Sequence, residues 1–375
     1  MRTSKIPPKK FPVFSKFFSA LDDPRRTHKG NFLYPFEEIL FLTISAIVSD
    51  AKSWEQIRVF AEDQLEWLQK FYPYENGIPS ADVLERLFAR LDTDAFNECF
   101  IAWVHEKTGL LKEEVIAFDG KTARGSKFAG SPALHMVSAF AANNRVTLGQ
   151  VAVDEKSNEI TAIPKLLDLL TVKGCIVTAD AMGCQKEIAS KIREKKADYI
   201  LQVKGNQKTL LEEVENVFNI TGTASVDHHR DFGHGRIESR TCSVITDLTF
   251  LDEKGNWKDV KSIVRLERKT IHKQNMKESS QVSYYISSAK FPAKKFNQAI
   301  RGHWAIENNL HWSLDVLFQE DASLKKKGNS AKNFNMMAKM ALSMIESGPE
   351  QKTSRIGKMK KCAYNQGFRE KVLNC

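Results

Sequence analysis

The chain has 375 residues, of which 42% are hydrophobic and 27% are charged. This composition excludes a wholly disordered chain, and the length allows two or three domains with a sizeable buried core. The formal net charge of +10 favours a polyanionic partner.

The positive charge gathers at the two ends of the chain. Residues 1–30 carry a net +6 and residues 323–375 carry +9, so residues 31–322 carry −5. A uniform DNA coat would not have an acidic middle. We therefore expect a basic N-terminal arm (1–30) and a basic C-terminal segment (323–375) to hold nucleic acid, while carboxylates between them have another task.

The cysteines and the apolar runs indicate the compartment. The six cysteines are scattered, without a Cys-x-x-Cys pair, which favours a reducing cytoplasm over a disulfide framework or a zinc ribbon. The longest apolar run, residues 39–48, is about half as long as a membrane span. The N-terminal residues lack the apolar segment of a signal peptide. We expect a cytoplasmic, nucleoid-associated protein with no membrane contact.

Residues 31–108 predict an all-helical N-terminal domain. Helical periodicity starts after Pro35, Ser53 opens a capping box, Ser80 caps a third helix, and Thr93 starts a fourth. Because a basic arm precedes these helices, we expect them to contact DNA. The alternative interpretation is a plain helical packing domain.

From residue 113 the periodicity changes to that of strands. The predicted elements are strands over 115–119, 134–142 and 146–153, then a helix over 162–170, a strand over 175–180, a helix over 185–196 and a strand over 199–203. Antiparallel strands followed by β-α-β crossovers predict an α/β fold with a mixed sheet, in the element order of an RNase H-like domain. We assign residues 109–322 to this domain.

A β-rich insertion is predicted at about residues 205–290. It comprises a helix over 210–218, a turn-rich surface loop with His228, His229 and His234, and strands near 236–246, 260–269 and 281–287. The three histidines lack the spacing of a metal site, so we interpret them as surface residues. A strong helix then covers residues 297–318.

Asp119 and Asp180 each end a predicted buried strand. Strand ends in α/β sheets meet at a common crevice, so the two carboxylates converge if their strands are neighbours. Close carboxylates repel unless a cation lies between them, and oxygen ligands suit Mg²⁺ or Mn²⁺. Two such ions can activate water and stabilise the leaving oxygen of a phosphodiester. In isolation, either Asp is equally well a capping or turn residue.

A third carboxylate is expected from the helix over 297–318. Its apolar stripe consists of Ile306, Leu310, Leu314 and Leu317. Glu307 lies at the edge of this stripe, with His303 and His311 four residues away on either side. Two alternatives stay open: a zinc ladder of His303, Glu307 and His311, and Asp315 as the third ligand.

Four motifs, FDGKTARGS, TADAMGCQ, LQVKGNQ and RGHWAIENNLHWSLDVLFQED, occur in this order. With them, nearly the whole chain resembles the ISAs-type insertion-sequence transposases, which include the H-repeat-associated proteins and belong to the DDE transposases. The resemblance implies an RNase H-like catalytic domain that cleaves DNA and transfers its strands. It also implies two divalent metal ions, normally Mg²⁺, for which Mn²⁺ can substitute. Asp119, Asp180 and Glu307 would be both catalytic triad and metal ligands.

The sequence departs from the wider DDE group around its Glu. The pattern Tyr-x2-Arg-x3-Glu-x6-Lys is represented here by Ile300, His303, Glu307 and Leu314, so only the Glu is kept. The roles of the Tyr, Arg and Lys are therefore not carried over. His303, or Arg301 nearby, is expected to contact phosphate instead.

Further DNA contacts are expected close to the strand ends. The expected DNA-binding residues are Lys121, Arg124, Lys204, Asn206, Gln207, Arg301 and His303. Trp257 and Trp304 are either base-stacking or packing residues, and the lysine run 325–327 is a phosphate-contacting or solvated tail.

These observations predict a transposase acting on double-stranded DNA as a homodimer, because two element ends must be brought together. The alternatives are a decayed or domesticated relative that binds DNA without cutting it, and a metal-dependent nuclease without strand transfer.

Overall fold

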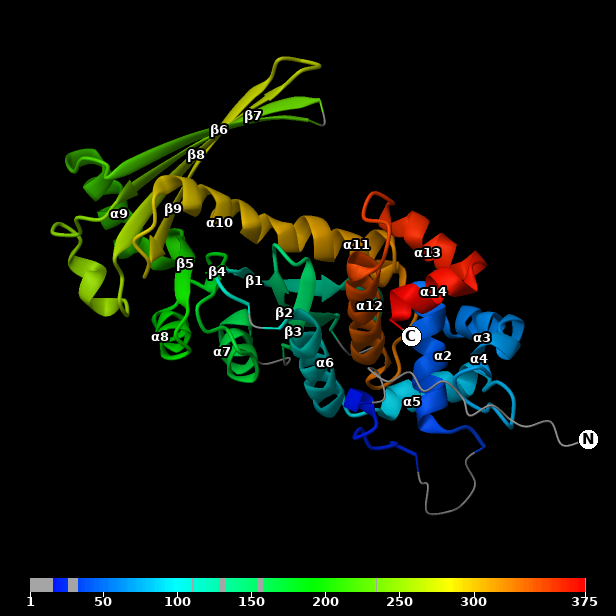
Figure 1. The fold of residues 1–375 in the computed structure, drawn as a ribbon. Coiled ribbons are helices and arrows are strands. Elements are labelled where there is room, and N and C mark those ends of the chain that lie inside the picture. Colours follow the sequence, from blue (N-terminus) through cyan, green and yellow to red (C-terminus); the bar gives the residue numbers. More distant parts are fainter. Residues whose placement is uncertain are drawn as a thin grey trace, which may run out of the picture.

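The computed structural model describes residues 16–25, 33–109, 111–127, 132–153, 158–233 and 235–374. Most of the predicted basic arm, and His234, lie outside these residues. Figure 1 shows a body of helices packed around a sheet, from which an arm of long strands projects. No helix among the described residues is long and apolar enough to cross a membrane.

One sheet of nine strands organises the molecule. The strands are β1 (Val115–Ala123), β2 (Leu134–Ala141), β3 (Val146–Ala152), β4 (Ile176–Ala179), β5 (Asp198–Val203), β6 (Ser225–Gly233), β7 (Arg236–Ile245), β8 (Ser262–His272) and β9 (Glu278–Ser287). Their order is β3-β2-β1-β4-β5-β9-β8-β7-β6. Strand β1 is antiparallel to β2 and parallel to β4, and β5 is parallel to β4. The predicted mixed α/β architecture is confirmed.

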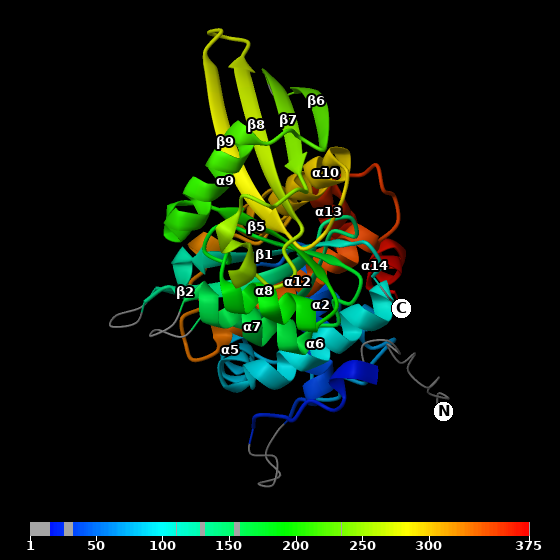
Figure 2. The same ribbon diagram turned by 90° about the vertical axis from the view of Figure 1, so that its left-hand side faces the viewer.

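The β-rich segment continues this sheet, because β9 pairs antiparallel with β5. Beyond that pairing, β6 to β9 leave the body as a twisted arm (Figures 1 and 2). The prediction of a turn-rich loop around His228 and His229 was wrong, since both lie on β6, paired with Thr241 and Arg240 of β7. This strand was missed because it is largely exposed on both faces and so lacks an apolar alternation.

Helices cover both faces of the central strands. Those of this region are α7 (Glu159–Leu169), α8 (Lys186–Glu194), α9 (Lys208–Ile220), α10 (Ala293–Ala305) and α11 (Trp312–Val316). Val115, Ile176 and Ile200 belong to the core cluster beneath α10, whereas their chain neighbours Ile116 and Val177 belong to the main cluster, which includes α7 and α8. Burial on both faces explains the continuous apolar runs that predicted these strands.

The N-terminal helices are α2 (Phe36–Val48), α3 (Trp54–Asp63), α4 (Leu65–Leu68), α5 (Ala81–Arg90) and α6 (Thr93–Thr108). The predicted caps are present: Oγ of Ser53 accepts the N–H of Gln56, and Oγ of Ser80 accepts that of Val83. Such caps satisfy backbone donors that a helix leaves free at its start.

The basic C-terminal segment folds against these helices. It forms α12 (Ser330–Ser347), α13 (Arg355–Tyr364) and α14 (Gln366–Leu373), and α12 contacts α2, α5, α6 and β3. Lys325 is buried, with Nζ 3.6 Å from the ring centre of Phe334 and hydrogen bonded to the carbonyl of Lys52. The interpretation of this lysine as part of a solvated or phosphate-contacting tail was therefore wrong, whereas Lys326 and Lys327 are exposed.

Candidate active site

Asp119 and Asp180 occupy neighbouring positions on parallel strands. The last register pair of β1 and β4 joins Phe118 to Ala179, so each aspartate is the next residue along the chain, Asp119 within β1 and Asp180 directly after β4. Contrary to prediction, Asp119 does not end its strand, because β1 continues to Ala123 paired with β2. It lies where the pairing with β4 stops, which opens space beside its carboxylate.

Glu307 reaches the same place from the helix that crosses the sheet. Between α10 and α11, residues Ile306–His311 form a π-helical stretch, whose hydrogen bonds join residues five apart instead of four. Asp119, Asp180 and Glu307 line one cavity of about 200 Å³, together with Lys204 and His303. The structure therefore brings together the three carboxylates that the sequence singled out.

Burial and nearby carboxylates raise the pKa of both aspartates in this cavity. Burial, followed by the charges of Glu159, Asp180 and Glu307, raises the pKa of Asp119 to about 7. Burial and the charge of Glu159 also raise the pKa of Asp180, although backbone N–H groups of Gly183 and Met182 partly offset this. A cation among these oxygens would remove the repulsion, so the donor set fits a hard divalent ion such as Mg²⁺ or Mn²⁺.

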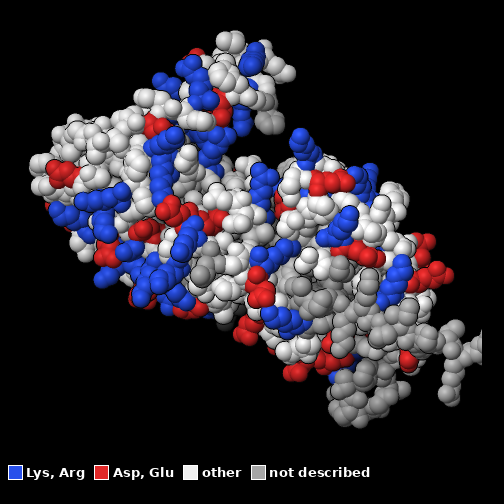
Figure 3. All heavy atoms as spheres, in the orientation of Figure 1, with Lys and Arg blue, Asp and Glu red and all other residues white. Residues whose placement is uncertain are grey.

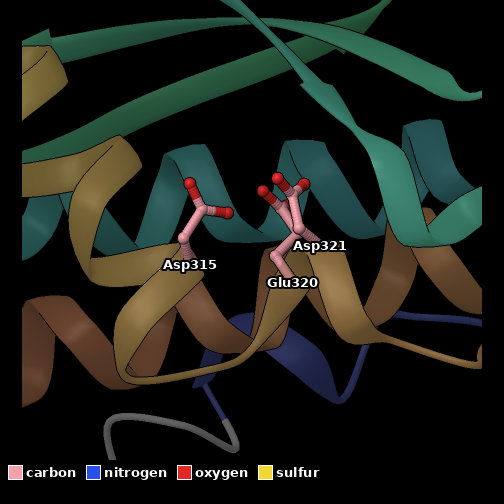
Figure 4. Close-up of side chains that lie close together, drawn as sticks. All are labelled: Asp315, Glu320 and Asp321. Atoms are coloured by element: carbon pink, nitrogen blue, oxygen red, sulfur yellow. The ribbon is translucent and has the colours of Figure 1, made fainter.

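A second acidic group already holds a cationic side chain. Asp315, Glu320 and Asp321 have ligand atoms within 4.8 Å of one another (Figure 4). Nζ of Lys121 lies 2.7 Å from Asp315, 2.6 Å from Glu320 and 3.7 Å from Asp321. The ammonium group offsets one of the three negative charges of this group, and Asp315 does not line the cavity of the triad. Lys121, whose side chain is 13% exposed, is turned toward these acids and away from the phosphate contact expected of it.

The zinc ladder of His303, Glu307 and His311 is not formed. Nδ1 of His303 lies 3.0 Å from Oγ1 of Thr178, whereas Nδ1 of His311 lies 3.6 Å from Oδ2 of Asp119. Within the described ranges, Asp315, Glu320 and Asp321 are the only three His, Cys, Asp or Glu side chains whose ligand atoms all lie within 4.8 Å of one another. The three carboxylates of the cavity are thus spaced more widely than a single-ion cluster. Burial lowers the pKa of His303 to about 4 and that of His311 to about 3.

Sequence comparisons match this arrangement to known proteins. Residues 110–344 match the family model "Transposase DDE domain", and residues 15–104 match the model "DDE_Tnp_1-associated". The chain is 42% identical over 366 residues to "Putative transposase YncI" of Escherichia coli O157:H7, covering 95% of this chain and 93% of that protein. It is 39% identical over 366 residues to "H repeat-associated putative transposase YhhI" of Escherichia coli strain K12, covering 95% and 96%.

The chain belongs to the H-repeat group of DDE transposases. The resemblance found in its four motifs is thereby confirmed.

In this transposase, residues after β5 hold the loop that follows Asp180. Nδ2 of Asn206 donates to the carbonyl of Ala181 at 2.7 Å, and Nε2 of Gln207 donates to that of Cys184 at 3.0 Å. Both amides thus position the loop of a carboxylate, although Asn206 is exposed and Gln207 half-buried. Lys204 remains exposed at the cavity.

The other expected DNA contacts are spread over the surface. The side chain of Arg124 is 84% exposed, and Arg301 is half exposed and paired with Asp231 at 2.7 Å. Trp304 is 45% exposed, with the guanidinium of Arg268 over its ring at 5.3 Å. Trp257 is only 2% exposed, which makes it a packing residue.

Sequence reasoning missed an arginine-lined hollow beside the triad. It has a volume of about 590 Å³ and shares Gln281, Tyr285, Ile300 and Trp304 with the cavity of the triad. Its cationic lining consists of Arg145, Arg236, Arg240, Arg268 and Arg301, against two acids, Asp231 and Glu238. Figure 3 shows Lys and Arg side chains gathered where the arm meets the body. Because these arginines come from four separate elements, only the fold brings them together.

Proposed function

We propose that this transposase cleaves DNA at the ends of a mobile element and transfers the freed strands into target DNA through Asp119, Asp180 and Glu307. The observation that carries this proposal is that β1, β4 and the π-helical stretch direct three carboxylates to one cavity. The strand order β3-β2-β1-β4-β5, with only β2 antiparallel to its neighbours, supports an RNase H-like catalytic domain.

The three carboxylates would hold two Mg²⁺ ions, with Mn²⁺ as a substitute. Bound there, the metal would acidify a water molecule and stabilise the oxygens of the phosphodiester under attack. The protein contributes the orientation of its own groups. Asn206 and Gln207 fix the loop after Asp180, Thr178 holds the ring of His303, and Lys204 offers positive charge to an incoming phosphate.

We infer that double-stranded DNA reaches the triad over the arginine-lined hollow. The arginines of the hollow, apart from the buried Arg240, would attract phosphates. Such contacts weaken at higher salt, because the release of counterions then contributes less entropy. Arg124, Arg301 and the exposed lysines 326 and 327 are further contact candidates. Because two element ends must be brought together, we propose a homodimer on cytoplasmic, nucleoid DNA.

A cleavage assay tests the proposal. The substrate is a supercoiled plasmid that carries the inverted repeats flanking this reading frame, with Mg²⁺ present. Asp119→Asn should abolish cleavage and leave DNA binding intact, because the amide keeps the shape but loses the charge. Asp252→Asn, the same change at an exposed aspartate, is the matched control.

The products separate the alternatives. Joined products support strand transfer, whereas cut but unjoined DNA identifies a nuclease. Wild-type protein that binds the repeats and never cuts them contradicts the proposal in favour of a DNA-binding relative. Cleavage by Asp119→Asn would show that the triad is assigned incorrectly.

A further inference from the structure

A fourth carboxylate approaches the triad from the other face of the sheet. Glu159 is the first residue of α7, which packs against β1, β2 and β3 and is capped by Asn158. Glu307, in contrast, follows α10 on the opposite face. The side chain of Glu159 is only 16% exposed, although a glutamate at the start of a helix normally projects into solvent.

A glycine makes this approach possible. Gly120 follows Asp119 in β1, and a side chain at Gly120 would point toward the start of α7. A β-carbon at position 120 would lie 2.0 Å from Oε1 of Glu159 and 2.6 Å from Nε2 of His135. Because real β-carbons do not come so close to other atoms, the missing side chain is what allows Glu159 to lie against the strand beside Asp119.

His135 fixes the orientation of this carboxylate. Its Nε2 lies 2.8 Å from Oε1 of Glu159, and its Nδ1 lies 2.8 Å from Oγ1 of Thr122, the partner of His135 across β1 and β2. With the proton on Nε2, the histidine donates to Glu159 and accepts from the threonine hydroxyl. The histidine therefore fixes Oε1 of this carboxylate and leaves Oε2 without a contact from the ring.

We propose that Glu159 is a fourth metal-facing carboxylate of the catalytic site, presented through the gap at Gly120 and held by His135. The proposal rests on the proposed function, since it concerns the metal that Asp119, Asp180 and Glu307 would bind. A position of Glu159 close to the metal ligands also agrees with the effect of its charge, which raises the pKa of both Asp119 and Asp180. Four carboxylates would balance the charge of two divalent ions, whereas three would leave one positive charge.

The test measures Mn²⁺ binding to the full-length protein by isothermal titration calorimetry, without DNA. Glu159→Gln removes the charge and should raise the Kd for Mn²⁺ at least about tenfold, the lower end of the usual effect of altering a metal site's surroundings. Gly120→Ala keeps every charge but displaces the carboxylate, so it should weaken Mn²⁺ binding in the same direction. Glu187→Gln, an exposed glutamate in the first turn of α8, should bind as the wild type does.

Asp119→Asn separates this inference from the proposed function. If Asp119→Asn loses Mn²⁺ binding while Glu159→Gln and Gly120→Ala retain the wild-type Kd, Glu159 does not face the metal and the triad stands. If Asp119→Asn also binds Mn²⁺ as the wild type does, the proposed function itself fails.

Unfolding temperatures measured in EDTA show whether Glu159 has only a structural role. A Glu159 that only anchors α7 to His135 would lower the unfolding temperature when changed to Gln and leave the Mn²⁺ affinity unchanged, which would overturn the proposal. If Glu159→Gln does not fold, Glu159→Asp takes its place. That variant keeps the charge but withdraws it by one methylene, and should bind Mn²⁺ more weakly than the wild type.

Discussion

The ammonium group of Lys121 lies 2.6 Å from Oε2 of Glu320, in the middle of an acidic group that would otherwise attract a metal ion. Lys121 and Asp119 lie on the same side of β1, two residues apart. The strand thus directs a carboxylate into the candidate catalytic cavity and a lysine into the neighbouring acidic group. The protein thus places a cationic side chain of its own in one acidic group, whereas the other would take an external cation.

Lys121→Met should destabilise the fold. It would leave Asp315, Glu320 and Asp321 without the cation that separates them, and removing one partner of a largely buried ion pair costs about 3 kcal/mol. Chemical denaturation measures the loss in the free energy of unfolding. Arg124→Met, at a side chain far more exposed, should change it by less than about 0.5 kcal/mol. Equal effects of the two variants would contradict a stabilising role of the Lys121 ion pairs.

Asp119 should make the metal-free protein less stable as the pH rises. Its pKa is about 7 in the folded protein against 3.8 when unfolded, so the folded state holds the extra proton between these values. Its stabilising contribution is complete below pH 3.8 and is lost as the pH rises through about 7. In EDTA at pH 8, Asp119→Asn should therefore unfold at a higher temperature than the wild type. Its free energy of unfolding should be higher by about 1–3 kcal/mol. A lower unfolding temperature for this variant would contradict the repulsion among the carboxylates.

Lys339 predicts the opposite dependence on pH. It is buried on α12, with Nζ 2.8 Å from Oγ of Ser138 and 2.5 Å from Oε1 of Gln150, and burial lowers its pKa from 10.5 to about 7. The unfolded chain therefore holds more protons between pH 7 and 10.5, and the contribution of Lys339 to stability increases with pH across this window.

Denaturation curves at pH 7, 8 and 9 check this slope. Lys339→Met should reduce the increase in unfolding free energy by up to about 1.4 kcal/mol per pH unit. Lys360→Met, at an exposed lysine of α13, should leave the slope as it is. The same slope in Lys339→Met as in the wild type would show that Lys339 is charged in the folded protein.

Much of the fold, and the proximity of two of the three cavity carboxylates, could be predicted because they depend on local patterns. Apolar runs predicted strands β1, β4 and β5, and Asp119 and Asp180 could be paired because each directly follows the last register pair of these parallel neighbours. Strand β6 was missed because an exposed arm needs no apolar alternation. It is held by pairing with β7 instead.

The remaining features of the site depend on contacts between distant segments. Glu159 has no motif of its own, and its proximity to Asp119 depends on Gly120 and on how α7 packs. His311 lies within the π-helical stretch with Nδ1 3.6 Å from Oδ2 of Asp119, a contact between distant segments that the sequence pattern did not predict. The ion pair between Lys121 and Asp315 spans 194 residues of sequence, so no local pattern could reveal that this lysine is already engaged.

Arg268→Ala should weaken the binding of double-stranded DNA. The guanidinium of Arg268 lies over Trp304 in the arginine-lined hollow, beside the cavity of the triad, where it would meet a phosphate. Removing one phosphate contact should lower affinity several-fold for any sequence and reduce the slope of log K against log salt by about 1. Fluorescence anisotropy from 50 to 200 mM salt measures both quantities. Lys258→Ala, at an exposed lysine outside the hollow, should change neither. An unchanged salt slope in Arg268→Ala would mean that DNA reaches the triad by another path.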